Sequence, residues 1–232
     1  MIKTLIFDVD GTLAETEEYH RRAFNVAFEE FGLDWVWDDA LYRDLLKVTG
    51  GKERIAHYIF RTGAMKDSMD PDGRSLAFLL HQKKTAIYTE MVRTGAVPLR
   101  AGIGDFLCAA AENGIGLAIA TTTSLPNIEA LLGATLGSQW RRMFPVVAAG
   151  DMVVNKKPAP DVYQLAVNLL DQNAEDCIAI EDSRNGVQSA LAAGLRVVAV
   201  RSDFARDDDL QGSIRQLPDC TWLSLELLRE IA

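Results

Sequence analysis

The chain has 232 residues, 48% of them hydrophobic, so it can bury a full core, either as one domain or as a core with a sizeable insertion. Its formal net charge of −9 argues against binding to nucleic acid, because such binding depends on a basic surface. No apolar run approaches the ~18 residues of a membrane-spanning helix, and the chain starts directly in its first predicted strand. We therefore expect a cytoplasmic protein without a membrane partner.

The first predicted strand covers residues 2–7 and runs directly into two carboxylates, Asp8 and Asp10, followed by Gly11 and Thr12. Positions two apart in an extended chain point to the same side, so both carboxylates can face one small volume. Hard oxygen ligands that lie so close together suit Mg²⁺. The alternative is an ordinary turn at Asp10 and Gly11 with a solvated Asp8, and this short motif alone does not decide between the two.

A long stretch with helical periodicity follows, and no strand pattern interrupts it between residues 16 and 92. We interpret it as an all-helical cap domain, residues 15–95, inserted into a core domain of residues 1–14 and 96–232. The predicted features of the cap are a helix over 19–31 ending at Gly32, a second helix from Asp38, a break at Thr49-Gly50-Gly51, a third helix through Ile55 and Ile59, a turn at Asp70-Pro71-Asp72-Gly73, and a helix over 76–91.

From residue 97 onward, predicted helices and strands alternate. This repeating pattern predicts an α/β fold with a Rossmann-like, mostly parallel sheet and helices on both faces. Ligands of such sheets bind at the carboxyl ends of the strands. The predicted elements are a helix through Ile103 that stops at Asn113-Gly114, a strand over 117–120, a helix over 124–136 capped by Ser124, a strand over 144–147, a helix opened by Pro160, a strand over 177–180, a helix over 184–193 and a strand over 197–200.

Two segments of this core are predicted to have structural rather than chemical roles. Cys108, Cys177 and Cys220 lie in apolar surroundings without the paired spacing of a metal site, so we expect buried free thiols. Such thiols suit a reducing compartment. The charged run Arg206-Asp207-Asp208-Asp209 is most simply a solvated loop.

Three further polar stretches follow core strands directly. Thr121-Thr122-Thr123-Ser124 offers hydroxyl and backbone N–H groups to phosphate oxygens, although simple helix capping is the alternative. Lys157 lies in the segment 156–161, where two prolines hold the backbone and leave the lysine at a helix entrance, although an ordinary solvated lysine is the alternative. Glu181 and Asp182 place two more acids at a strand end, and Asp182 is a candidate second metal ligand.

Together, the stretches DVDGT, TTTS, KPAPD and EDSRNG resemble, in order, the four motifs of the haloacid-dehalogenase-like superfamily of phosphatases and phosphomutases. The resemblance implies that Asp8 attacks phosphorus to give an aspartyl-phosphate, while Asp10 protonates the leaving oxygen and later deprotonates water. It also implies that Thr121 and Lys157 bind the transferring phosphoryl group. The implied ligands of Mg²⁺ are the side chains of Asp8 and Asp182, the backbone carbonyl of Asp10 and, through water, Glu181.

The cap resembles that of the subgroup containing β-phosphoglucomutase and, more closely, the CbbY-type sugar-bisphosphate phosphatases, whose known substrate is xylulose-1,5-bisphosphate, an inhibitor of the carbon-fixing enzyme Rubisco. Lys52 and Arg54 bring the positive charge that a distal phosphate needs, although solvated cap charges are the alternative. The residues expected to bind substrate are Glu17, His20, Gly50, Gly51, Lys52, Arg54, His81 and Lys84 in the cap, with Thr122, Thr123, Ser124 and Asn127 in the core.

The leading hypothesis is thus a Mg²⁺-dependent phosphatase of a small sugar phosphate, most simply a bisphosphate, acting as a monomer. The nearest rival is a phosphomutase, because His20 matches a cap histidine that serves the mutase subgroup. A third hypothesis is a non-enzymatic sugar-phosphate sensor, against which the pair Asp8 and Asp10 argues, since binding alone needs no nucleophile beside an acid. Dehalogenase chemistry is disfavoured because that branch lacks the second aspartate of the first motif.

Overall fold

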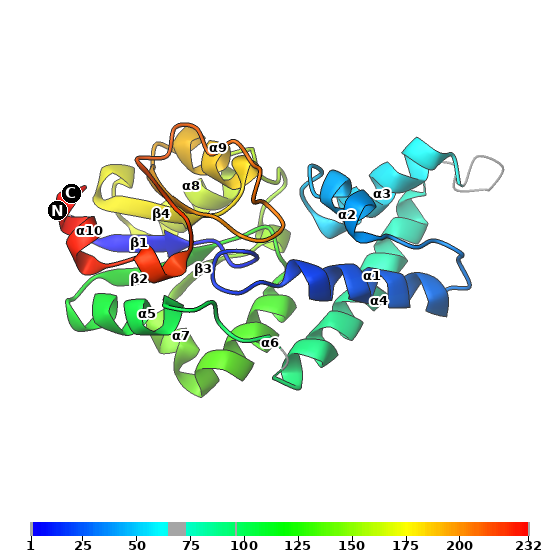
Figure 1. Ribbon diagram of the computed structural model, residues 1–232, viewed down its shortest axis with the longest axis horizontal. Coiled ribbons are helices and arrows are strands. Elements are labelled where there is room, and N and C mark those ends of the chain that lie inside the picture. The colour runs from blue at the N-terminus through cyan, green and yellow to red at the C-terminus, as the bar shows by residue number, and fades with distance from the viewer. Residues whose placement is uncertain (1, 65–72, 96, 232) are drawn as a thin grey trace.

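The computed structural model describes residues 2–64, 73–95 and 97–231, and its centre is a parallel six-stranded sheet (Figure 1). The strand order is β3-β2-β1-β4-β5-β6, and each neighbouring pair is parallel. The α/β prediction is therefore confirmed. The strands are β1 (Thr4–Phe7), β2 (Gly116–Ala120), β3 (Val146–Ala148), β4 (Cys177–Glu181), β5 (Arg196–Val200) and β6 (Arg215–Leu217).

Successive side chains of each buried strand point to opposite faces of the sheet, so both faces are apolar and helices cover both. In β1, Leu5 and Phe7 join one hydrophobic cluster, whereas Ile6 joins another. The first cluster lies under α5 (Ile103–Glu112), α6 (Leu125–Leu136), α7 (Trp140–Met143) and α10 (Leu225–Glu230). The second lies under α8 (Asp161–Leu170) and α9 (Arg184–Ala192), on the opposite side of the sheet in Figure 1.

A group of four helices lies beside the sheet, at the end away from the two termini (Figure 1). These helices are α1 (Glu17–Glu30), α2 (Asp39–Leu45), α3 (Gly51–Thr62) and α4 (Arg74–Arg93). They enclose their own aromatic cluster, in which the rings of Phe24 and Trp37 lie 4.7 Å apart. The predicted helical cap is thus present. Its boundaries at residues 15 and 95 stay a prediction, and residues 70–72 of the predicted turn lie outside the described residues.

The helix ends in the cap follow the local signals. Asp38 precedes α2 and its side chain accepts a hydrogen bond of 2.8 Å from the backbone N–H of Leu41. Gly32 follows α1 with φ of +69°, a left-handed conformation that glycine adopts without strain. These two residues confirm the predicted start of the second helix and the stop of the first.

Several predicted details of the core were wrong. The third strand starts two residues later than residue 144, whereas Pro160 stands at the N-cap of α8 and opens this helix as predicted. Ser124 stands at the N-cap of α6 but makes no capping hydrogen bond. Cys108 is exposed, because Phe106 and Leu107 turn the other side of α5 toward the sheet, whereas Cys177 and Cys220 are buried free thiols as expected.

Three elements were not predicted at all: β6, α7 and α10. Single 3₁₀ turns complete the described chain at Gly137–Gln139, Gly150–Met152, Ala174–Asp176 and Cys220–Trp222. In the part of the chain that the structure describes, every helix is too short or too polar to cross a membrane.

Candidate active site

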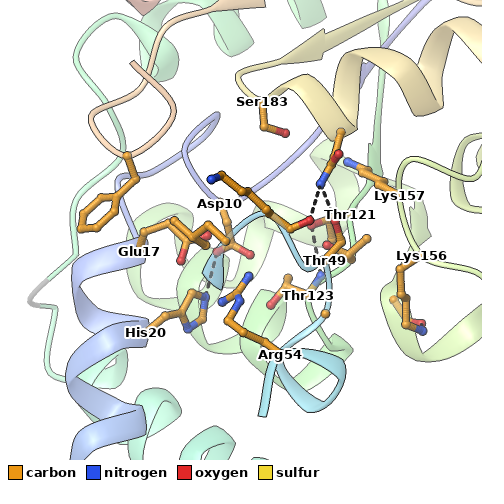
Figure 2. Close-up of a pocket in the computed structure, with 18 of the residues that line it drawn as sticks. Asp10, Glu17, His20, Thr49, Arg54, Thr121, Thr123, Lys156, Lys157 and Ser183 are labelled. Carbon is orange, nitrogen blue, oxygen red and sulfur yellow. Dashed lines mark hydrogen bonds and ion pairs between the residues drawn. The ribbon is translucent and has the colours of Figure 1, made fainter. Parts of the chain in front are cut away.

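A cavity of about 810 Å³ lies where the carboxyl ends of the strands meet the helical cap. Every residue predicted to act in catalysis, metal binding or substrate binding lines this cavity, apart from Glu181, which is fully buried beside it. In Figure 2, Asp10 and Lys157 approach the cavity from the sheet, and His20 and Arg54 approach it from the cap. The structure therefore brings the predicted residues of the core domain and those of the cap together around one cavity.

Three carboxylates form a tight acidic cluster at the end of β1 and β4. Asp8, Glu181 and Asp182 each offer an oxygen atom, and these atoms lie within 4.8 Å of one another. Burial raises the pKa of Asp8 to about 7, although the Lys157 ammonium opposes this shift. Burial, with the charges of Glu181 and Asp8, also holds the pKa of Asp182 well above its usual range. The alternative of a solvated Asp8 is therefore wrong, and the cluster suits a cation.

Lys157 is the buried counter-charge of this cluster. Its Nζ donates to Asp8 Oδ1 at 2.7 Å, to Glu181 Oε1 at 2.6 Å and to the carbonyl oxygen of Ala120 at 3.0 Å. Burial alone would lower the pKa of Lys157, but the two carboxylates more than offset this and raise it. With only 4% of its side chain exposed, Lys157 is not the ordinary solvated lysine of the alternative interpretation.

Glu181 is held by three donors. Its Oε1 accepts from Lys157 and also from the hydroxyl of Tyr163 at 2.7 Å, while its Oε2 accepts from the backbone N–H of Asp182 at 3.2 Å. Gly186 of α9 lies so close that a Cβ there would fall 1.9 Å from Glu181 Oε2. Glu181 thus fixes Lys157 at the cavity wall. The sequence did not reveal Tyr163, because it stands in the apolar pattern of α8.

Asp182 is oriented by hydroxyl groups on both of its oxygens. Thr12 Oγ1 donates to Oδ1 at 3.3 Å, and Ser202 Oγ donates to Oδ2 at 2.5 Å. Gly11 packs directly against the same carboxylate, since a Cβ at Gly11 would lie 2.1 Å from Asp182 Oδ2. This close approach, together with a φ of +82°, explains the glycine after Asp10. Ser202 carried no signal in the sequence, because it follows the last predicted strand without a recognisable motif.

Asp10 connects the sheet with the cap. Its Oδ1 lies 3.1 Å from His20 Nε2 (Figure 2). The same oxygen accepts from Thr16 Oγ1 at 2.5 Å, and His20 Nδ1 lies 2.7 Å from the Nζ of Lys84. Burial would raise the pKa of Asp10, but the charge and hydrogen bond of His20, with that of Thr16, lower it to about 2. Burial also lowers the pKa of Lys84 to about 7. Asp10 is therefore ionised in the free protein.

The hydroxyl stretch after β2 leaves polar atoms free for a ligand. Thr121 is buried, and its Oγ1 accepts from the backbone N–H of Thr123 at 3.3 Å. Asn127 donates to Thr123 Oγ1 at 3.1 Å, but its Oδ1 has no partner. The hydroxyl of Ser124 is likewise buried without a partner. These two buried polar atoms need a partner, which an ordered water or a bound ligand would supply.

The two predicted cap cations differ in their surroundings. The side chain of Lys52 is 52% exposed, and its Nζ lies 3.9 Å from Glu53. Arg54 is buried and donates to the hydroxyl of Tyr42 at 3.0 Å, which in turn donates to Glu17 at 2.6 Å. Lys52 is thus exposed and loosely paired, so that a ligand can displace its ion pair with Glu53, whereas Arg54 also organises the cap.

The remaining predicted cap residues lie around these cations. Gly50, with φ of +93°, precedes α3, and Gly51 begins it against the ring of His81. Burial, followed by the charges of Lys84 and Lys52, lowers the pKa of His81 to about 3. His81 is therefore a neutral imidazole that can donate or accept a hydrogen bond.

The prediction of a solvated loop over 206–209 is confirmed, since Arg206, Asp207 and Asp209 are exposed, but the loop also lies beside the cavity. Asp207, Asp208 and Asp209 line the cavity, and Asp208 accepts from the backbone N–H of Arg184 at 2.7 Å, at the start of α9. The position of this loop after the carboxyl end of β5 was the missed signal. Other lining residues that were not predicted include Arg43, Lys47, Thr49, Lys156, Asn185 and Phe204.

Comparison with known proteins agrees with this geometry. A family model described as haloacid dehalogenase-like hydrolase matches residues 2–194. The chain belongs to the haloacid dehalogenase-like hydrolases. Within this family, CbbY of Cereibacter sphaeroides is 48% identical over 217 residues, which cover 94% of this chain and 92% of that protein.

Two solved structures of haloacid dehalogenase-like hydrolases are similar along almost the entire chain. The crystal structure of CbbY from Rhodobacter sphaeroides in complex with phosphate has a TM-score of 0.87 and 46% identity, with 97% of each chain covered. A mutant of that CbbY in complex with xylulose-(1,5)bisphosphate has a TM-score of 0.88 at the same identity and coverage. The chain is accordingly a hydrolase of the phosphatase type.

Proposed function

We propose that this hydrolase is a Mg²⁺-dependent phosphatase that converts xylulose-1,5-bisphosphate into xylulose-5-phosphate and phosphate through an aspartyl-phosphate on Asp8. The observation that carries the proposal is one cavity with the buried cluster of Asp8, Asp182 and Lys157 on its sheet side and Lys52 on its cap side. A sugar with a phosphate at each end offers a charge to both sides. The CbbY structure with xylulose-(1,5)bisphosphate supports the choice of sugar.

The acidic cluster has the chemistry of a magnesium site. Its donors are hard carboxylate oxygens, and burial, together with the charges of neighbouring carboxylates, raises the pKa of Asp8 and of Asp182, so a cation there would stabilise their ionised forms. The side chains of Asp8 and Asp182 and the backbone carbonyl of Asp10 would hold the ion, with Glu181 behind them. When bound, Mg²⁺ neutralises charge on the phosphoryl oxygens.

The residues of the chain divide the reaction between them. The carboxylate of Asp8 attacks phosphorus, and the bond from phosphorus to the sugar oxygen breaks. Lys157 and Thr121 hold the equatorial oxygens of the phosphoryl group. Asp10 gives its proton to the leaving oxygen and later takes a proton from the water that hydrolyses the aspartyl-phosphate.

The low pKa of Asp10 in the free protein suits the second of these steps, because an ionised carboxylate accepts a proton from water. The first step needs a proton on Asp10. The negative charge of a bound phosphate ester shifts the pKa of the nearby carboxyl upward, toward the protonated form. His20 and Thr16 keep the carboxyl facing the cavity in both states.

The phosphomutase alternative differs in a single step, the transfer of the phosphoryl group to a second hydroxyl instead of water. The contact between His20 and Asp10 is compatible with both reactions, so the products decide. The sensor hypothesis has lost its support, since the chain belongs to a hydrolase family and carries both Asp8 and Asp10. The monomeric state and the cytoplasmic location of the protein stay predictions.

Removal of the metal is expected to stop the reaction, and binding of Mg²⁺ is expected to strengthen as pH rises through about 7. Asp8 must lose its proton to bind the ion, and its pKa lies near 7. Below that pH, affinity should fall about tenfold per pH unit for each proton displaced. The measurements are activity with EDTA and then Mg²⁺, and the rise in Tm that Mg²⁺ causes at pH 5.5 and at pH 8.

Without metal, the pH dependence of stability has the opposite sign. Asp8 binds its proton more tightly in the folded protein than in the unfolded chain, where its pKa is 3.8. Its contribution to stability is therefore lost as pH rises through about 7. Full activity in EDTA, or an equal rise in Tm with Mg²⁺ at both pH values, would contradict the assigned site.

The bisphosphate assignment is tested with Lys52→Ala. If Lys52 holds the distal phosphate, its loss should cost on the order of 2–4 kcal/mol in transition-state binding, which is about thirty- to thousandfold in kcat/KM. The same change should affect a monophosphate of the sugar much less. The measurement is kcat/KM for xylulose-1,5-bisphosphate and for its monophosphates, in the wild type and in the variant.

Lys83→Ala is the matched control, because Lys83 is also a cap lysine but pairs with Glu30 and does not line the cavity. Arg54→Ala should also lower kcat/KM for the bisphosphate more than for the monophosphates, with a further loss of stability because Tyr42 loses a partner. Equal losses on both substrates would assign Lys52 and Arg54 to cap structure alone. A wild type that prefers monophosphates would overturn the bisphosphate assignment.

A further inference from the structure

A short segment after β5, Arg201–Ala205, contacts both the acidic cluster and the cap. On the core side, Ser202 Oγ donates to Asp182 Oδ2 at 2.5 Å and accepts from the backbone N–H of Ala205 at 3.3 Å. The backbone N–H of Arg201 donates to the carbonyl oxygen of Leu217 in β6 at 3.0 Å. The segment is therefore fixed to the core at the carboxylate that faces the proposed metal.

On the cap side, the same segment presents the ring of Phe204 to α2. This ring meets the ring of Tyr42 edge-on, at 5.9 Å and 83°. The guanidinium carbon of Arg43 lies 4.3 Å from the centre of the Phe204 ring, and Arg43 also donates to the carbonyl oxygen of Asp203 at 2.8 Å. Phe204 thus belongs to the core domain but packs against the aromatic cluster of the cap.

The partner of Phe204 in the cap is itself linked to the cavity. The Tyr42 hydroxyl donates to Glu17 and accepts from Arg54, and both of these residues line the cavity. Phe204 thus lies one aromatic ring away from the groups through which the cap faces a substrate. A second contact between core and cap joins Asn185 of α9 to Thr49, in the connection between α2 and α3, at 2.9 Å.

We propose that Phe204 is a positioning residue that holds the Tyr42–Glu17–Arg54 group of the cap over the carboxylates of the core. It acts through Tyr42 and Arg43 and touches no reacting atom. Because Ser202 anchors the same segment to Asp182, the placement of the cap is fixed relative to the acidic cluster rather than to a remote part of the sheet. The substrate used in the test rests on the proposed function, whereas the contacts themselves do not.

The test compares Phe204→Ala with Phe204→Tyr, which keeps the ring, and with Phe60→Ala. Phe60 is the matched control, since it is a cap phenylalanine that is 79% exposed and does not line the cavity. Phe204→Ala should lower kcat/KM for the sugar bisphosphate about tenfold, the scale of one aromatic contact and one cation–π contact. Phe204→Tyr should retain wild-type kcat/KM within about twofold, and so should Phe60→Ala.

Two readouts separate positioning from stability. The first is kcat/KM for p-nitrophenyl phosphate, a substrate without a second phosphate for the cap to bind. Phe204→Ala should change this kcat/KM by less than about twofold. The second is small-angle X-ray scattering without substrate, in which Phe204→Ala should show a larger radius of gyration than the wild type. If the alanine variant does not fold, Phe204→Leu keeps apolar volume while losing both ring contacts.

Equal losses on both substrates, or a Phe60→Ala variant with the same loss, would overturn the proposal, as would unchanged kinetics in Phe204→Ala. If the wild type fails to hydrolyse the bisphosphate, it is the proposed function that fails. The scattering comparison then decides the role of Phe204 by itself, because an unchanged radius of gyration means that the ring does not hold the cap.

Discussion

Asp8→Asn is expected to lower kcat by at least about a thousandfold, because the amide keeps the shape of the side chain but is neither a nucleophile nor an anionic ligand. The structure adds an expectation about stability. Asp8 is buried beside Glu181 and Asp182, and burial raises its pKa. Loss of its charge therefore relieves repulsion, while Lys157 keeps its bond to Glu181. The metal-free Tm of the variant should equal or exceed that of the wild type.

The measurements are steady-state release of phosphate and thermal unfolding in EDTA. Asp151→Asn is the matched control, since Asp151 also lines the cavity but is exposed and lies outside the acidic cluster. The control should retain activity close to that of the wild type. Turnover near the wild-type rate in Asp8→Asn would remove Asp8 from the mechanism, and a large drop in its metal-free Tm would show that Asp8 mainly supports the fold.

Asp10→Asn is expected to lower kcat by about a hundred- to ten-thousandfold, the usual contribution of a general acid and base. Attack by Asp8 remains possible in this variant, but neither the leaving oxygen nor the attacking water is assisted. The His20 and Thr16 side chains can still bond to the amide, so the cap should stay in place. Steady-state kinetics and small-angle X-ray scattering measure the two effects separately.

Thr16→Ala is a useful comparison for Asp10→Asn, because it removes one hydrogen bond to the carboxylate without removing the carboxylate itself. A loss of only a few-fold is expected for Thr16→Ala, the scale of one hydrogen bond. If Asp10→Asn lost no more activity than Thr16→Ala, Asp10 would be a structural link to the cap rather than the acid and base.

The sequence predicted the sheet and the chemical groups at its edge because both depend on short-range patterns. Buried parallel strands appear as apolar runs, and a polar stretch directly after such a run lies at the carboxyl edge, which is how Asp8, Thr121 and Asp182 were found. β6 escaped prediction because Arg215 and Gln216 in this edge strand are exposed and form no apolar run.

The rest of the site depends on contacts between segments that are far apart in the sequence. Tyr163 holds Glu181, Ser202 holds Asp182 and Phe204 meets Tyr42, yet none of these residues stands in a local pattern that distinguishes it from an ordinary core or loop position. The same reason explains why Lys52 and Arg54 seemed equivalent in the sequence. In the structure, the burial of Arg54 and its bond to Tyr42 separate it from the exposed Lys52.

Hydrolysis of a sugar bisphosphate through Asp8 can be tested by the products of a single reaction. Wild-type protein with Mg²⁺ and xylulose-1,5-bisphosphate is followed by ³¹P NMR, with Asp8→Asn as the blank. We expect one equivalent of inorganic phosphate for each equivalent of xylulose-5-phosphate, and no change in the sample with Asp8→Asn. Conversion into an isomeric phosphate without release of inorganic phosphate, or an unchanged bisphosphate in the wild-type sample, would contradict this expectation.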